Sequence, residues 1–230
     1  MILMASPLHN NLRSTLLLLV FSPYLLVGCV TPAAIEEVPL KQVLAIDQSQ
    51  SARSVFFSKL VLDLARGSKY GVTKLWFFCL PTSNLYWGDN PIVMAESDVR
   101  NAFNQMLAKG KYTVIGRPEA LFEDPSKAEL IVAGLVKEMR INLCTEGGGM
   151  GGPGFVTGES YIEVQWQVYS RAEGKVVYET KTEGSFKDKA SGNGARPLII
   201  GAFSNATHNL LADMGFHTLV TRRHLQPGTS

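Results

Sequence analysis

The stretch YIEVQWQVYSRAEGKVVYETKT, residues 161–182, decides the fold of this chain. Its first half alternates between apolar and polar side chains, and the apolar ones are Ile162, Val164, Trp166 and Val168. Alternation with a period of two is typical of a β-strand that buries one face. The pattern returns from Val176, and Gly174 in the short connection suits the positive φ that hairpin loops of this length often need. The stretch therefore predicts a β-hairpin.

Two further regions have the same period. Residues 128–143 are apolar and alternate in their later half, which predicts a strand that precedes the hairpin. Residues 56–65 alternate, residues 66–71 carry turn-forming residues, and residues 72–80 are again apolar, so we expect a second hairpin there. A helix over residues 55–65 is the competing interpretation, because Ala, Leu and Lys tolerate helices.

The period changes to that of a helix in two places. From Ser97 to Gly110 apolar residues recur at three- and four-residue steps, with Ser97 as a suitable N-cap and Gly110 as a suitable end. A short strand, residues 112–115, is expected next. From Pro197 to Met214 the helical spacing returns, with proline in the first turn. This order predicts an α+β fold with a mostly antiparallel sheet and two amphipathic helices packed on one face.

The amino-terminal residues have the order of a bacterial export signal. Arg13 precedes an apolar stretch, residues 14–26, that is too short to span a bilayer comfortably but suits the h-region of a signal peptide. The tetrapeptide Leu26-Val27-Gly28-Cys29 follows directly and resembles the lipobox of bacterial lipoproteins. This resemblance implies a signal peptide over residues 1–28 and lipid attachment to Cys29. An uncleaved signal anchor and an ordinary secretory signal are the alternatives.

The resemblance also carries an expectation about location. Val30, not an aspartate, follows the cysteine, and by resemblance to enterobacterial sorting this favours the outer membrane with the domain facing the periplasm. Residues 29–53 contain Pro, Ala, Glu, Gln and Ser without a sustained period, so we predict a flexible tether. Residues 54–221 are predicted to form a single domain, and residues 222–230 a disordered tail.

The domain resembles a region found ahead of trypsin-like protease domains in some envelope proteins. The resemblance covers residues 55–220 and rests on Leu64-Ala65-Arg66-Gly67, Cys79, Cys144, Val164 to Tyr169 and Leu210 to Asp213. It implies a regulatory or targeting module for an envelope serine protease. A more distant likeness over residues 97–214 is to curli-secretion and periplasmic accessory lipoproteins. Its motifs include Tyr112-Thr113-Val114, Ala128 to Gly134 and Gly174 to Glu179.

The chain has three cysteines, Cys29, Cys79 and Cys144. If Cys29 carries lipid, an even pair remains in an oxidising compartment. Cys79 and Cys144 both fall at the ends of predicted strands, which would allow them to meet at one edge of the sheet. We predict a disulfide between them, with two independent buried thiols as the alternative.

No set of residues predicts enzymatic chemistry. His208, His217 and His224 lie near the carboxyl end without a nucleophile motif, and His208 and His217 lack a metal-binding spacing on one helix face. The glycine-rich stretch 146–154 lacks the Gly-Lys-Ser/Thr ending of a phosphate-binding loop. The net charge of +2 indicates no broad basic surface for nucleic acid. We therefore expect no catalytic residue, cofactor, metal or nucleic acid.

Tyr86 and Trp87 lie in a predicted loop, where large aromatic side chains often mark binding. They are the candidate residues for contact with a partner, and burial against the edge of the domain is the alternative. Together these features predict a non-enzymatic, lipid-anchored envelope protein whose domain binds another envelope protein in transport, secretion or envelope maintenance. A hydrolase that uses His208 and His217 is a further alternative. The sequence does not indicate the oligomeric state.

Overall fold

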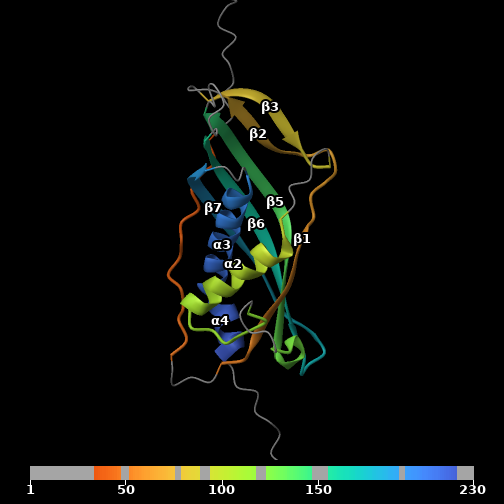
Figure 1. Ribbon diagram of the computed structural model, residues 1–230. Coiled ribbons are helices and arrows are strands. Elements are labelled where there is room, and N and C mark those ends of the chain that lie inside the picture. Colours follow the sequence, from red (N-terminus) through yellow and green to blue (C-terminus); the bar gives the residue numbers. More distant parts are fainter. Residues whose placement is uncertain are drawn as a thin grey trace, which may run out of the picture. The chain divides into compact units, whose positions relative to one another are not determined.

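The structure, a computed structural model, describes residues 34–47, 52–75, 79–88, 94–117, 123–146, 155–191 and 195–221. Within these ranges seven strands form one sheet, accompanied by three α-helices and a short 3-10 helix (Figure 1). In chain order the elements are β1 (Val55–Leu62), β2 (Lys69–Leu75), β3 (Leu80–Tyr86), α2 (Glu96–Lys109), β4 (Val114–Ile115), η2 (Pro125–Lys127), β5 (Leu130–Glu146), β6 (Phe155–Ser170), β7 (Lys175–Ser191), α3 (Arg196–Leu211) and α4 (Met214–Thr221).

Strand β5 organises the sheet. Along one edge β5 pairs antiparallel with β6 from Leu130↔Ser170 to Glu146↔Phe155, and β6 pairs antiparallel with β7. Along its other edge β5 pairs with β1 and then with β2, in both cases parallel, and β1 also pairs parallel with β4. The α+β class is confirmed, but the prediction of a mostly antiparallel sheet is wrong because the sheet is mixed.

The expected hairpin over residues 56–80 is the source of that error. The turn at residues 66–71 does not reverse the chain: β1 ends beside Val136, and β2 begins to pair with β5 at Ile141, further along the same edge. The strand that folds back on β2 is β3, from Lys69↔Tyr86 to Leu75↔Leu80. Alternation of apolar and polar side chains indicates that one face of a strand is buried, but it does not indicate which strand pairs with it.

The hairpin predicted from residues 161–182 is confirmed. Trp166 lies opposite Thr180 and Val168 lies opposite Tyr178, and Gly174 in the connection has a φ of 65°. Both strands continue beyond the predicted stretch, to Phe155 in β6 and to Ser191 in β7. The apolar side chains that alternate in β6 are fully buried, so the period in the sequence identified the core face correctly.

The helices cover one face of the sheet (Figure 1), as predicted. Between them and the sheet lies an aromatic cluster in which Phe103 of α2 stacks on Phe57 at 4.5 Å between ring centroids, and Trp166 lies 5.8 Å from Phe203 of α3. The indole nitrogen of Trp166 donates to Thr182 Oγ1 at 2.7 Å, so the largest buried side chain leaves no polar atom without a partner.

The helix ends differ from the predicted ones. Helix α2 begins after Ala95, with no side-chain cap, so Ser97 is not the N-cap that we predicted. The second helix ends at Leu211, before the predicted Met214, and α4 follows as a third helix. The break comes at Asp213, whose carboxylate accepts a hydrogen bond from the backbone N–H of Phe216 and so caps α4.

Candidate functional site

Residues 34–47 run against the domain, and the prediction of a flexible tether over residues 29–53 is wrong for this part. Ile35 and Ile46 are buried, and backbone N–H groups along the segment donate to the sheet and to the helices. The hydrogen bonds run from the amide of Ile35 to Glu159, of Val38 to Ser185, of Lys41 to Asn209, of Leu44 to Leu211 and of Ile46 to Gly110. We call residues 34–47 the strap. Residues 29–33 and 48–51 lie outside the described residues.

The strap crosses the free edge of β7. Among the described strands β7 pairs only with β6, and a long open edge invites pairing with other chains. Helix α3 occupies part of this edge: Asn205 Nδ2 donates to the Ser185 carbonyl at 2.6 Å, and Asn209 Nδ2 donates to the Glu183 carbonyl at 2.9 Å. The strap adds the bond from Val38 N to Ser185 Oγ at 2.7 Å. Sequence reasoning missed these asparagines, because their role depends on knowing where the edge lies.

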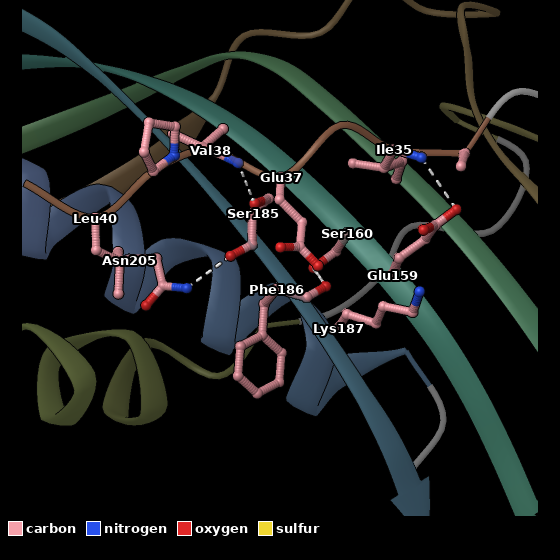
Figure 2. A pocket seen from close by; sticks show the side chains of 12 residues that line it. Ile35, Glu37, Val38, Leu40, Glu159, Ser160, Ser185, Phe186, Lys187 and Asn205 are labelled. Carbon is pink, nitrogen blue, oxygen red and sulfur yellow. Dashed lines mark hydrogen bonds between the residues drawn. The ribbon is translucent and has the colours of Figure 1, made fainter.

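A pocket of about 540 Å³ lies between the strap, β6, β7 and α3 (Figure 2). Glu159 Oε1 accepts hydrogen bonds at its rim from Ile35 N at 3.1 Å and from Asn142 Nδ2 at 2.7 Å. Glu37 and Lys187 also line the pocket. The hydrogen bonds of Glu159 hold the amino-terminal end of the strap on the sheet.

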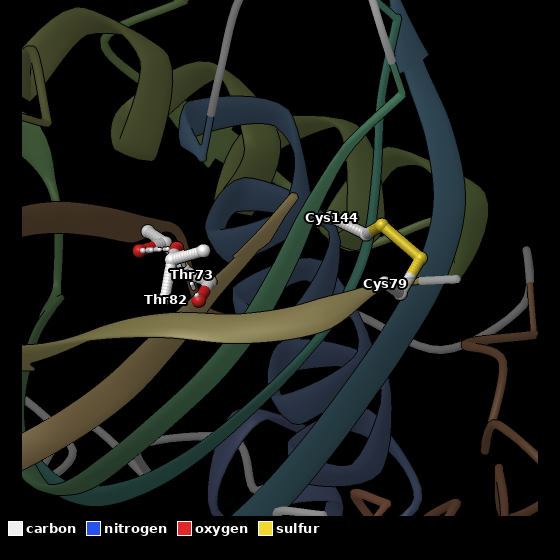
Figure 3. Close-up of a disulfide and its surroundings, with 4 residues drawn as sticks. All are labelled: Thr73, Cys79, Thr82 and Cys144. Atoms are coloured by element: carbon white, nitrogen blue, oxygen red, sulfur yellow. Dashed lines mark hydrogen bonds between the residues drawn. A yellow bond between two sulfur atoms is a disulfide. The ribbon is translucent and has the colours of Figure 1, made fainter. Parts of the chain in front are cut away.

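Cys79 and Cys144 form a disulfide with a Cα–Cα separation of 5.4 Å (Figure 3). Cys79 stands directly before β3, and Cys144 lies near the carboxyl end of β5. The bond thus fixes the closed end of the β2–β3 hairpin to the central strand. A second pocket, of about 610 Å³, lies beside the bond, and its lining includes Ala34, Lys74 and Glu159 in addition to both cysteines.

The two aromatic residues proposed for partner contact have different environments. Tyr86 is the last residue of β3 and is 40% exposed. Trp87 is half-buried and lies edge-on to Tyr70 at 6.4 Å, and its backbone carbonyl accepts from the Gly67 amide. Tyr86 is therefore presented to solvent, whereas Trp87 packs against the edge of the domain.

The histidines in the described part of the chain bond to structural groups. His217 Nδ1 lies 3.1 Å from the Tyr112 hydroxyl, and His208 Nε2 lies 2.8 Å from the Lys41 carbonyl of the strap. Burial raises the pKa of Tyr112 well above its usual range, which keeps this hydroxyl neutral. Among the described residues no three His, Cys, Asp or Glu side chains form a metal-binding group. Cys29, His224, residues 147–154 and the predicted tail lie outside the described residues.

Asp213 joins α4 to the sheet. Its carboxylate accepts from the Tyr178 hydroxyl of β7, from Thr180 Oγ1 at 3.3 Å and from Phe216 N at 3.0 Å. Partial burial acts to raise the pKa of Asp213, but the hydrogen bonds from Tyr178 and from the amide of Phe216 outweigh it and leave the pKa below 3.8. Burial and the bond to Asp213 raise the pKa of Tyr178 to about 12. This cluster holds the carboxylate charged at neutral pH.

Asp213→Asn is expected to lower the free energy of unfolding by about 1–2 kcal/mol at pH 7. Asparagine can still cap a helix, so the loss reflects the charge-assisted bonds. Because the folded pKa is lowered, this contribution is present above the unfolded-state pKa and is lost as pH falls through the folded value. Urea unfolding should therefore show a difference between wild type and variant that narrows below about pH 4. Glu36→Gln, at an exposed position, is the control, and a constant difference down to pH 2 would contradict this explanation.

No helix in the described part of the chain is long and apolar enough to cross a membrane. The sequence matches no protein-family model and no curated protein. Among solved structures it is similar to a Xanthomonas campestris protein of family DUF330, with 12% identity over 79% of this chain and 94% of that chain and a TM-score of 0.38.

Two further solved structures are similar at the same level. A single-substitution variant of the PelC dodecamer from Paraburkholderia phytofirmans is 17% identical over 75% of this chain and 95% of that chain, with a TM-score of 0.33. A minor lipoprotein from Acinetobacter baumannii is 6% identical over 75% and 98%, with a TM-score of 0.34. Likenesses at this level assign no family to the chain, and the resemblance to a region ahead of trypsin-like protease domains stays a prediction.

Proposed function

We propose that this chain is a non-enzymatic cell-envelope lipoprotein, anchored through Cys29, whose domain contacts another envelope protein. The observation that carries the proposal is Leu26-Val27-Gly28-Cys29 placed directly after a short apolar stretch. The bond between Cys79 and Cys144 supports it, because disulfides persist in oxidising compartments such as the periplasm. Val30 after the cysteine favours the outer membrane, with the domain on the periplasmic side.

A role in binding and not in catalysis agrees with the bonding of the polar side chains. The carboxylates of Glu159 and Asp213 hold the strap and α4, and His208 and His217 bond to the strap and to Tyr112. Each of these four polar side chains thus has a structural hydrogen-bond partner. The exposed ring of Tyr86 at the end of β3 is the contact that we assign to the partner protein.

The anchor is tested by labelling cells that express the full chain with radioactive palmitate. Wild type should be labelled and should fractionate with membranes, while Cys29→Ser should lose the label and remain uncleaved. Val30→Asp should keep the label but move to the inner membrane if the sorting analogy holds. Equal labelling of wild type and Cys29→Ser would refute the anchor.

The partner is tested in the same cells with a photoreactive benzophenone amino acid placed at position 86. Irradiation of intact envelopes should give a discrete protein adduct, identified by mass spectrometry. Position 214 serves as the control, because Met214 is 65% exposed and belongs to a different element. The same adduct from both positions, or none from position 86, would argue against a partner at the end of β3.

A further inference from the structure

The last residue pair of the β2–β3 hairpin is apolar and exposed. Leu75 and Leu80 lie opposite each other as the last pair of the two strands, and they are 41% and 55% exposed. Along β3 and the two residues after it, from Leu80 to Gly88, the sequence contains no charged residue. Strand β2 pairs with β3 and β5, and in Figure 1 the helices do not reach over this hairpin. An apolar end of this kind is a typical contact site for another apolar surface.

The structure also places the start of the described chain beside this end. Ala34 lines the same pocket as Cys79, Cys144 and Lys74. The next residue, Ile35, is tied through Glu159 to Asn142, which lies two residues before Cys144 on β5. The disulfide then connects Cys144 to Cys79, the residue directly before Leu80. A continuous set of bonds thus links the amino-terminal end of the strap to the hairpin end.

The distance from the anchor follows from chain length. Five residue steps separate Cys29 from Ala34, and an extended chain covers at most about 3.6 Å per residue, so the two Cα atoms lie at most about 18 Å apart. The strap cannot lengthen this connection while Ile35 stays bonded to Glu159. A lipid on Cys29 would therefore hold this end of the sheet close to the membrane surface, whereas the turn at residues 171–174 lies at the opposite end of the sheet.

Two lysine side chains near the hairpin end are suited to contact with a membrane surface. Lys74, beside Leu75, and Lys187 of β7 both line the pocket there, where an ammonium group can meet lipid phosphates. Two carboxylates, Glu159 and Asp188, line the same pocket, so the region is not strongly basic. The apolar pair is thus the main source of membrane contact, and the lysines add to it at the level of the headgroups.

We propose that Leu75 and Leu80, the last pair of the β2–β3 hairpin, enter the interfacial layer of the membrane that holds Cys29. The inference rests on the proposed lipid anchor. It gives the domain a second membrane contact beside the lipid, and the two contacts together fix its orientation. The exposed Tyr86, at the other end of β3, then faces the periplasm, where a protein partner can reach it.

The test places a benzophenone amino acid at position 80 of the full chain and, in a separate protein, at position 176. Val176 is 43% exposed and lies at the start of β7, at the opposite end of the sheet, so it is a matched apolar control. Cells are grown with ³²P-phosphate, which labels phospholipid headgroups but not the thioether-linked lipid of the anchor. After irradiation of intact envelopes, position 80 should give a ³²P-labelled adduct at several times the yield of position 176.

A parallel culture labelled with palmitate separates the two proposals. If Cys29 is acylated but position 80 gives no more ³²P adduct than position 176, the hairpin contact is refuted and the anchor stands. If position 80 gives a protein adduct in place of lipid, from a partner or a second copy of this chain, the contact is also refuted. A ³²P adduct at position 80 without palmitate on Cys29 would refute the anchor and with it the proposal, because the hairpin would then reach lipid without a membrane that holds Cys29.

Discussion

Gly184→Ala is expected to lower the free energy of unfolding by about 3 kcal/mol or more, which is at the upper end for overpacking in a core. Gly184 lies in β7 where α3 crosses it, and it is buried. A Cβ atom built on Gly184 would lie 2.2 Å from the Ala202 carbonyl oxygen and 2.3 Å from the Ala206 nitrogen. Both atoms belong to the helix backbone, so a side-chain rotation cannot relieve the overlap and the helix has to move away from the strand.

The Gly184→Ala substitution is also expected to affect hydrogen bonds between α3 and β7. Displacement of α3 would disturb the bond from Thr182 Oγ1 to the Ala206 carbonyl and the bond from Asn209 to the Glu183 carbonyl. Because Thr182 donates its hydroxyl proton to Ala206, its oxygen is free to accept the hydrogen bond from the indole N–H of Trp166, the largest fully buried side chain. The strand edge that the asparagines occupy would then be open, so we also expect the variant to aggregate more readily.

Urea unfolding followed by circular dichroism measures the loss of stability, and light scattering measures aggregation. Gly67→Asn is the control, because no atom lies within 4 Å of the Cβ position at Gly67 and asparagine tolerates the positive φ of 78°. The control should stay within about 1 kcal/mol of wild type. A Gly184→Ala protein as stable as the control would mean that α3 and β7 are not in close contact at this position.

The central hairpin was predictable because its signal is local. Trp166 and its apolar neighbours at every second position face one core, so a period of two identified both the strand and its buried face. The same reasoning located α2, where Val99, Phe103 and Leu107 are buried at helical spacing. The exact helix starts were less predictable, because Ala95 precedes α2 without any side-chain cap that the sequence would announce.

The parallel pairing of β1 with β5, and of β2 with β5, was not predictable from the residues of β1 and β2 alone. The side chains of β1 alternate and those of β2 do not, and the shared neighbour β5 comes more than 50 residues later in the chain. The strap was missed for a related reason. Residues 34–47 mix short apolar runs with Glu, Lys and Gln and have no sustained period, and the hydrogen bonds of this segment go to β6, β7 and the helices. The hydrogen-bond partners of that segment can be identified only when the position of the β7 edge is known.

The disulfide is the element of the candidate site that could be reached from the sequence, through the parity of the cysteines. Cys79→Ala/Cys144→Ala is expected to lower the free energy of unfolding by about 4 kcal/mol, the loop-entropy value for a closed loop of this length. The two cysteines are 65 residues apart in sequence, and the loop that they close contains β3, α2, β4, η2 and most of β5. Removing the bond therefore restores freedom to a large part of the unfolded chain.

The local effect should be concentrated at the β2–β3 hairpin. Its attachment to the rest of the sheet is the parallel pairing from Gly71↔Ile141 to Leu75↔Thr145, whereas β6 and β7 pair along their full lengths. Hydrogen exchange should consequently speed up over residues 69–86 in the double variant and change little over residues 161–182. Thiol labelling of denatured wild type checks the premise: equal labelling with and without reductant would show that the bond does not form.

The same variant connects stability to the proposed membrane contact. Without the bond, Leu80 is no longer held beside Cys144 and the amino-terminal end of the strap, so its distance from the anchor is no longer fixed. The ³²P-phospholipid adduct from position 80 should fall in the double variant, while palmitate labelling of Cys29 should remain unchanged. A hairpin that reached lipid through its apolar residues alone would keep its adduct. The outcome thus separates a hairpin positioned by the disulfide from one that finds the membrane without it.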